Sequence, residues 1–219
     1  MPIAIRDRNM PNPSLAPLPA LEVRRETRAH VMARLQNKTE SEMARRFAEG
    51  HRAYLALRSG EPAAWGWLAT RSARIGELES SFTIPAGERY LWNFVTHPAH
   101  RGQGIYPRLL DAITQVEQSE AERFWVAYAP ENHASGAGIR KAGFMDVAAL
   151  SFDSHGQPAV TDIMDGGATL AAQFLGIPAV EELLAQCWRC VKHAGPMNSS
   201  CAAGPCTCDY QRVEVGCAH

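Results

Sequence analysis

The hydrophobic and polar positions of this chain are most regular around residues 90–113. An apolar-rich run over residues 90–96 has the length of one buried strand. Pro98 ends that strand, because proline has no N–H to donate to a strand ladder. A turn with glycine at positions 102 and 104 follows, and glycine lets a backbone turn tightly. Apolar residues then recur at helical spacing and predict a helix: Ile105, Leu109, Leu110 and Ile113.

The pattern before this stretch predicts two helices, a hairpin and one more strand. The first helix is expected to begin at Glu22, with an apolar stripe over residues 31–35. Thr39 and Glu42 form a capping-box signature for the second helix, which ends near residue 50. The expected strands are residues 52–58 and 63–70, joined as a hairpin, and residues 75–82.

The two ends of the chain have different patterns. Residues 1–20 hold five prolines, which predicts an extended, poorly ordered leader, although Ile3 and Ile5 are able to add an edge strand. Asn132 is expected to start a helix that ends on Gly143. The remaining expected elements are strands over residues 124–129 and 144–152 and helices over residues 168–174 and 179–188.

A strand, a glycine turn and a helix start in succession predict an anion-binding site. The first N–H groups of a helix lack partners and point outward, with the positive end of the helix dipole behind them. A phosphate or pyrophosphate is the natural ligand of such a corner. The glycine spacing matches neither a P-loop nor a dinucleotide-binding motif. A strand–turn–helix corner without any ligand is the alternative reading.

Two motifs in order resemble the GCN5-related N-acetyltransferase (GNAT) family. Arg101-x-x-Gly104 after a strand and His-Pro resembles the family's pyrophosphate loop. Asn132-x-x-Ser135, followed by a segment ending in Gly143-Phe144, is similar to its closing pattern. The resemblance covers roughly residues 20–153. There are two departures: Tyr106 stands at a position that is small in the family, and Ile139 at the position of its common tyrosine.

The resemblance implies an α/β (α+β) fold with a central mixed, mostly antiparallel sheet. In this family the sheet is flanked by helices and splays apart between its fourth and fifth strands. The domain organisation expected from it is a flexible leader over residues 1–20, an acyltransferase domain over residues 21–153, and a helical extension with a cysteine-rich tail over residues 154–219.

The resemblance also implies acyl-CoA-dependent N-acyl transfer. The expected reaction moves an acetyl group from acetyl-CoA to a primary amine of a small molecule or peptide, by direct attack in a ternary complex. The pyrophosphate would lie on the turn and the pantetheine arm along the preceding strand. The cofactor-binding residues that this implies are Phe94, Val95, Thr96, Arg101, Gly102, Gln103, Gly104, Ile105, Tyr106, Asn132 and Ser135.

The residues that move protons are less defined by the sequence. An ammonium acceptor must lose a proton before it attacks, and Glu79, beside Glu77 on a predicted strand, is the preferred base. A solvent-facing glutamate is the other reading of Glu79. Tyr90 occupies a position where some family members keep a glutamate base. With Ile139 unable to donate a proton, the leaving thiolate is either protonated by another hydroxyl or leaves unassisted; the candidate hydroxyls are Ser135, Tyr90 and Tyr128.

Composition narrows the partners and the location. The chain has 22 basic and 23 acidic residues and a net charge of −1. It therefore lacks the excess positive charge that would attract nucleic acid or an anionic membrane. No apolar run approaches the roughly 18 residues of a membrane span, and the N-terminus lacks the apolar core of a signal peptide. A cytoplasmic location is therefore expected, and homodimer formation is left open.

All six cysteines fall in the last 33 residues. Cys187-x-x-Cys190 and Cys206-x-Cys208 have spacings compatible with a tetrahedral zinc site. Reduced thiols and disulfides are the alternatives. The tail also supports a second functional hypothesis, a non-catalytic acyl-CoA-binding or regulatory module in which it senses metal or docks a partner. A third hypothesis is that the tail recognises the acceptor.

Overall fold

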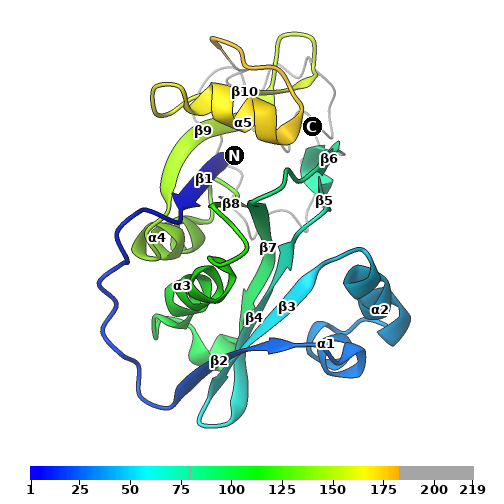
Figure 1. Ribbon diagram of the computed structural model, residues 1–219, viewed down its shortest axis with the longest axis vertical. Coiled ribbons are helices and arrows are strands. Elements are labelled where there is room, and N and C mark those ends of the chain that lie inside the picture. The colour runs from blue at the N-terminus through cyan, green and yellow to red at the C-terminus, as the bar shows by residue number, and fades with distance from the viewer. Residues whose placement is uncertain (79, 183–219) are drawn as a thin grey trace, which may run out of the picture.

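The computed structural model describes residues 1–78 and 80–182. In this part of the chain, eight strands form one twisted, mostly antiparallel sheet (Figure 1). Its order across the sheet is β10 (Pro158–Asp162), β9 (Met145–Phe152), β1 (Pro2–Asp7), β8 (Arg123–Ala127), β7 (Glu88–Thr96), β4 (Glu61–Ala69), β3 (Arg52–Arg58) and β2 (Leu21–Glu26). A separate hairpin joins β5 (Ser72–Ile75) to β6 (Ser80–Thr83). The expected mixed, mostly antiparallel fold is confirmed.

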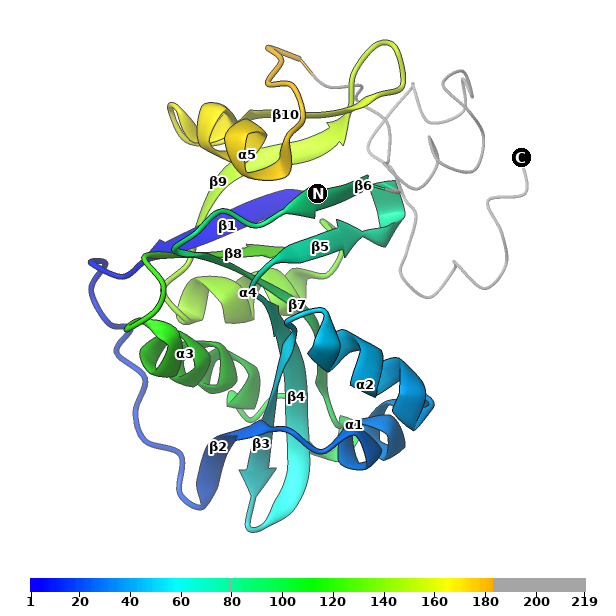
Figure 2. The ribbon, with the colours of Figure 1, turned by 45° about the vertical axis from the view of Figure 1, so that its right-hand side comes forward.

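Helices cover both faces of the sheet (Figures 1 and 2). One face packs against α3 (Ile105–Glu117) and α4 (His133–Lys141), with apolar residues of β3, β4, β7 and β8 beneath them. On the other face, α1 (Ala29–Gln36) and α2 (Glu40–Ala48) cover the β3–β4 end. On that same face, α5 (Gly167–Leu175) and the β5–β6 hairpin cover the β8–β1–β9 end. The partly buried Trp92 packs against both the core under α1 and α2 and the core under α5 and the β5–β6 hairpin.

Two upstream elements differ from the sequence expectation. Residues 21–26 form β2 rather than the start of a helix, because the neighbouring β3 pairs with them from Leu21 to Glu26. The strand expected over residues 75–82 is interrupted by a 3₁₀ turn at Gly76–Leu78. The N-cap half of the capping-box signature is confirmed, since the Thr39 side chain accepts a hydrogen bond from the N–H of Glu42 at the start of α2.

The first seven residues are not a leader or an edge strand. They form β1, which pairs antiparallel with β8 on one side and with β9 on the other. Ile3 and Ile5 are 0% and 2% exposed, so both side chains belong to the core that α5 covers. The prolines between residues 11 and 19 suggested an extended leader from position 1 onward, but the strand ends before them at Asp7.

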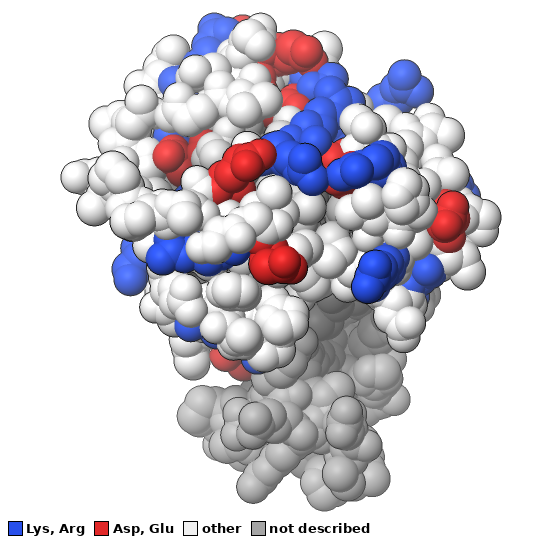
Figure 3. Space-filling view, turned by 90° about the horizontal axis from the view of Figure 1, so that it is seen from below, with Lys and Arg blue, Asp and Glu red and all other residues white. Residues whose placement is uncertain are grey.

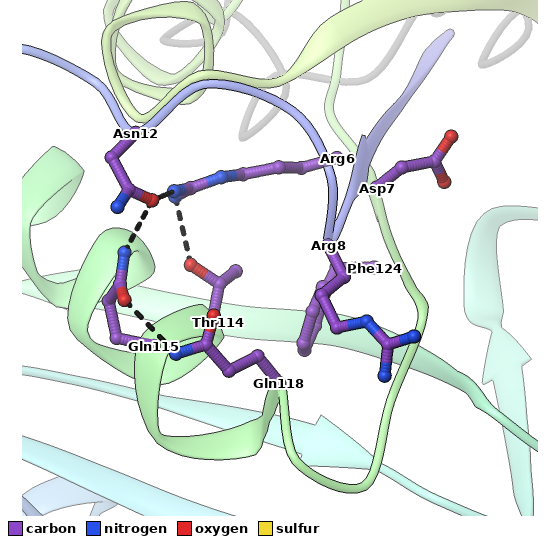
Figure 4. A pocket seen from close by; sticks show the side chains of 8 residues that line it. All are labelled: Arg6, Asp7, Arg8, Asn12, Thr114, Gln115, Gln118 and Phe124. Atoms are coloured by element: carbon purple, nitrogen blue, oxygen red, sulfur yellow. Dashed lines mark hydrogen bonds between the residues drawn. The ribbon is translucent and has the colours of Figure 1, made fainter.

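The segment after β1 is held against α3 by side-chain hydrogen bonds. The buried Arg6 guanidinium donates to Thr114 Oγ1 at 2.8 Å and to Asn12 Oδ1 at 3.0 Å, and it pairs with Asp111 at 2.7 Å. Gln115 on α3 also donates to Asn12 Oδ1 at 2.7 Å. Figure 4 shows the side chains of Arg6, Asn12, Thr114 and Gln115 converging around a small polar hollow between the first residues of the chain and α3. Residues 6–12 are thus tied to α3, and the flexible leader expected over residues 1–20 stays a prediction for the rest of that range, residues 13–20.

The turn between β2 and α1 is organised by one buried carboxylate. Glu26 is 3% exposed, and its Oε1 accepts hydrogen bonds from the N–H groups of Thr27 and Arg28 at 3.1 and 3.0 Å. The Arg28 guanidinium donates to both carboxylate oxygens, at 2.8 and 2.7 Å. This side-chain bond to Arg28, with the backbone bonds, lowers the pKa of Glu26 to about 2.

We predict that Glu26→Gln removes a pH-dependent part of the stability. A carboxylate with a depressed folded-state pKa stabilises the fold above its ordinary pKa, and this contribution is lost as the pH falls toward the folded-state value. The difference in unfolding free energy between the parent and Glu26→Gln should therefore shrink between pH 5 and about pH 2. Its pH-dependent part should reach at most about 3 kcal/mol near neutral pH. Urea unfolding at several pH values measures it.

Glu22 provides the matched control on the same strand, since its side chain is exposed. Glu22→Gln should leave the unfolding free energy within about 0.5 kcal/mol of the parent at every pH. A Glu26→Gln variant with the same pH dependence as the parent would contradict the assignment of this carboxylate.

Candidate active site

The sheet opens where β7 separates from β8. The two strands pair in parallel over only four residues, from Glu88 opposite Arg123 to Leu91 opposite Val126. Beyond Leu91, no described strand pairs with β7 on this side, while β4 continues along its other side as far as Thr96. The second half of β7 therefore has one paired and one open edge, as the predicted splay requires.

A bulge lies at the start of this open half. Trp65 is opposite Val95 and Trp67 is opposite Trp92, so Gly66 of β4 faces two residues of β7. The extra residue is Asn93, which adopts a left-handed conformation with φ of 53°. Bulges of this kind re-aim a strand locally and are common beside active sites.

Gly66 is necessary for the packing around the bulge. A Cβ atom placed on Gly66 would lie 2.1 Å from two ring atoms of Phe94, so the phenyl ring rests directly on the glycine backbone. Gly66 was not among the residues that the motifs predicted to shape the site. Its one available signal was a glycine in the interior of an apolar strand, which often marks close approach of another group.

The hydrogen bonds between β4 and β7 show which way the main-chain groups of the open edge point. His97 donates its N–H to the Ala63 carbonyl of β4 at 2.8 Å. Because successive residues of a strand direct their main-chain groups to opposite sides, Thr96 and Phe94 direct theirs away from β4. The Thr96 carbonyl accepts a hydrogen bond from Arg101 Nε at 3.3 Å. The open edge thus presents main-chain donors and acceptors to an extended ligand.

The glycine turn has the geometry expected of an anion site. Gly102 and Gly104 have φ of 76° and 69°, a conformation that other residues rarely adopt. Gly104 is the residue before α3, whose first turn contains no acidic side chain. Arg101, Gly102 and Gln103 are exposed, and Ile105 is buried as the first core residue of the helix.

Tyr106 spans the space between α3 and α4. Its ring lies 5.6 Å from the Phe94 ring, centroid to centroid, and a Cβ on Gly138 of α4 would lie 2.5 Å from it. Burial raises the pKa of the Tyr106 phenol to about 12, against a smaller lowering by the Ser135 hydroxyl. The phenol is therefore a neutral hydrogen-bond donor at any physiological pH.

Asn132 and Ser135 lie together at the start of α4. The Asn132 side chain accepts a hydrogen bond from the Ser135 N–H at 3.0 Å and is thus the N-cap of the helix. This capping explains the spacing of the motif, and it places both side chains at the end of α4 nearest Tyr106.

The candidate proton-transfer residues have contrasting surroundings. Tyr90 is 5% exposed and packs edge-on against Phe82, with ring centroids 5.4 Å apart. The Tyr128 hydroxyl donates to the Asp146 carboxylate and accepts from Arg140 at 2.9 Å. These two hydrogen bonds hold α4 against β9. Ile139 is fully buried.

The remaining predicted site residues lie outside the described residues. They are Glu79 and the four cysteines expected to bind zinc, Cys187, Cys190, Cys206 and Cys208.

Neither a metal site nor a membrane-spanning helix is found among the described residues. Among these residues, no group of three or more histidine, cysteine, aspartate or glutamate side chains is placed to hold a metal ion. No helix in the described ranges is both long and apolar enough to cross a membrane. The face seen from below carries basic and acidic side chains intermingled, with several basic groups in a band across it (Figure 3).

An open strand edge beside a glycine turn at a helix start is an arrangement that suits an extended ligand with an anionic end. The sequence profile of the acetyltransferase (GNAT) family matches residues 20–144. The chain therefore belongs to this family, as its motifs indicated, and it is an acetyltransferase with an acyl-CoA cosubstrate. No curated protein matches the chain.

Several solved structures are similar in fold. An acetyltransferase of the GNAT family from Streptococcus pneumoniae is 15% identical, with a TM-score of 0.45 over 59% of this chain and 88% of that one. An aminoglycoside antibiotic 6'-N-acetyltransferase from Acinetobacter haemolyticus is 22% identical, with a TM-score of 0.42 over 57% and 91%. An aminoglycoside N-acetyltransferase in complex with CoA is 14% identical, with a TM-score of 0.44 over 57% and 92%.

Proposed function

We propose that this protein transfers an acetyl group from acetyl-CoA to a primary amine of a small molecule or peptide. The observation that carries the proposal is the open half of β7, which lies directly before the glycine turn and the start of α3. A pantetheine arm has amide groups that can pair with a free strand edge, and a pyrophosphate suits unpartnered helix-start N–H groups. One ligand, a coenzyme A thioester, presents both in this order.

In the proposed complex, the pyrophosphate lies on the main-chain N–H groups of the turn. The residues concerned are Arg101, Gly102, Gln103, Gly104, Ile105 and Tyr106. The pantetheine arm follows Thr96, Val95 and Phe94 toward the bulge. Asn132 and Ser135, at the start of α4, contact the arm from the opposite side of the opening.

The reaction is a direct attack on the thioester. The acceptor ammonium first loses a proton to a base, and the free amine nitrogen then bonds to the thioester carbon. A main-chain N–H of the bulge stabilises the negative charge on the carbonyl oxygen. The C–S bond breaks as the tetrahedral intermediate collapses. The nitrogen gives up its second proton and the thiolate takes up a proton, so that a neutral amide and coenzyme A leave. A thiol pKa near ~8.5 makes this sulfur a fair leaving group.

Three side chains are proposed for the proton transfers. Glu79 is assigned to the acceptor side, where it would remove the ammonium proton, and the Tyr90 hydroxyl is a candidate proton donor to the leaving thiolate. Ser135 is assigned to the leaving thiolate. The Tyr106 phenol supports the assignment of this end of α4 to the leaving group, because burial raises its pKa to about 12 and keeps it protonated.

A second function, acyl-CoA binding without catalysis, is favoured by one observation. Ile139 stands where the family's general-acid tyrosine is expected and is completely buried. Native mass spectrometry with acetyl-CoA, followed by thiol release over a panel of polyamines, aminoglycosides and peptide amines, separates the two functions. Binding with turnover supports the transferase, binding without turnover supports the module, and no binding overturns both.

A substitution in the turn tests the binding site itself. Gly104→Ala should weaken acetyl-CoA binding about 5- to 30-fold, because alanine costs roughly 1–2 kcal/mol in the left-handed conformation that the turn requires. Gly176→Ala is the matched control: Gly176 has nearly the same φ, 68° against 69°, but lies at the end of α5. Isothermal titration calorimetry measures both. Equal affinities in the two variants would count against the turn as the pyrophosphate site.

A further inference from the structure

Asn93, the left-handed residue of the β7 bulge, is hydrogen-bonded to α1. Asn93 Nδ2 donates a hydrogen bond to Gln36 Oε1, the last residue of that helix, at 3.1 Å. Asn93 precedes Phe94, the first residue of the open edge that directs its main-chain groups away from β4. The conformation of Asn93 therefore sets the direction of the Phe94 N–H.

Gln36 is itself held from several directions. Its Oε1 also accepts hydrogen bonds from Trp67 Nε1 at 3.2 Å and from Arg46 Nη1 at 3.3 Å. Its Nε2 donates to the Met32 carbonyl at 3.3 Å. Three donors converge on the oxygen and a carbonyl faces the nitrogen, so the orientation of this side-chain amide is fixed by its partners.

Arg46 extends the same network onto the sheet. Its guanidinium lies over the rings of Trp92 and Trp67, 4.9 and 5.2 Å from their centroids. Glu42, one turn earlier on α2, accepts a hydrogen bond from Arg46 at 3.2 Å. The oxygen that receives Asn93 is thus tied to α1, α2 and β4 at once.

We propose that Gln36 is a positioning residue for acetyl transfer. Its oxygen holds Asn93 in the left-handed conformation and thereby aims the Phe94 N–H at the thioester oxygen, where negative charge develops. This inference rests on the proposed function, because it assigns a role within that reaction. Gln36 does not touch the substrate; it acts through the backbone of the bulge.

The physical reason lies in the cost of the Asn93 conformation. Left-handed φ is unfavourable for residues other than glycine, although asparagine tolerates it better than most. Without an acceptor for its side chain, Asn93 gains less from staying left-handed, and the bulge is free to relax into other arrangements. An oxyanion donor that turns away loses most of its effect, since such hydrogen bonds act through preorganised geometry.

Gln36→Met tests this role. Methionine has nearly the same length but provides no comparable acceptor. We expect kcat for acetyl transfer to fall about 10- to 100-fold, while the Kd for acetyl-CoA, measured by calorimetry, stays within about twofold. Gln36→Glu keeps an acceptor oxygen for Asn93 but loses the donor to the Met32 carbonyl, so it should keep more of the parent's kcat than Gln36→Met does.

Asn93 variants provide a second, independent readout. Asn93→Gly removes the side-chain bond but adopts positive φ without strain, so it should retain more activity than Asn93→Ala. Adding Gln36→Met to Asn93→Gly should lower kcat much less than Gln36→Met does alone, because the contact it removes is already absent.

The possible outcomes separate this inference from the function on which it rests. No turnover by the parent protein overturns the proposed function and the catalytic role of Gln36 together. Turnover that Gln36→Met leaves unchanged overturns only the positioning role. A loss in Gln36→Met that Gln36→Glu shares equally, or one seen only as a lower melting temperature at unchanged kcat, also overturns it.

Discussion

Replacing Gly66 by alanine is expected to reduce kcat for acetyl transfer by about 100-fold or more. The new Cβ would lie 2.1 Å from the Phe94 ring, far inside any van der Waals contact, and Cγ of the ring is only 2.7 Å away. The ring cannot swing clear by moving its far end alone. Phe94 and the bulge before it must shift, and the proposed oxyanion N–H shifts with them. Loss of one such donor costs 10²- to 10³-fold in comparable sites.

Stability should suffer less than activity in Gly66→Ala. Overpacking of a core typically costs about 1–3 kcal/mol, which a domain of this size is able to absorb. Gly76→Ala is the control, because a Cβ there meets nothing within 4 Å. Steady-state thiol release and thermal unfolding should be measured on both variants. Full activity in Gly66→Ala would refute the role of this glycine in shaping the bulge.

Removal of residues 1–7 is expected to abolish cooperative unfolding. This deletion takes out β1, which lies between β8 and β9, and leaves the facing edges of both strands without their hydrogen-bond partners. Unpaired main-chain groups in a core each carry a cost comparable to a lost hydrogen bond. The core that β1 shares with α5 would also lose Ile3 and Ile5.

A pair of substitutions tests the same point in the full-length chain. Ile5→Asp places a charge at a position that is 2% exposed and should lower stability by more than about 4 kcal/mol. Val116→Asp, at a position 61% exposed on α3, should cost less than about 0.5 kcal/mol. Urea denaturation followed by circular dichroism measures both. A truncated chain that unfolds with the cooperativity of the parent would show that β1 is dispensable.

Local chemistry was enough to predict the parts of the site that are continuous in sequence. The apolar run, the proline and the two glycines imply β7, its end and the turn into α3 without reference to any other segment. The spacing of Asn132 and Ser135 likewise implies a helix cap, which the hydrogen bond between them confirms. Such features depend on backbone conformation within a few residues, and sequence therefore reports them directly.

Long-range pairing decided the rest. Residues 21–26 are a strand because β3 offers them an edge, and residues 2–7 are an internal strand because β8 and β9 leave a space of one strand between them. The same holds for the bulge, where Asn93 of β7, Gln36 of α1 and Gly66 of β4 meet from three elements. The sequence by itself determined where the glycine turn and the helices α3 and α4 begin. Only the tertiary structure decided which strands lie side by side and what holds the bulge, since these contacts join residues that no local pattern connects.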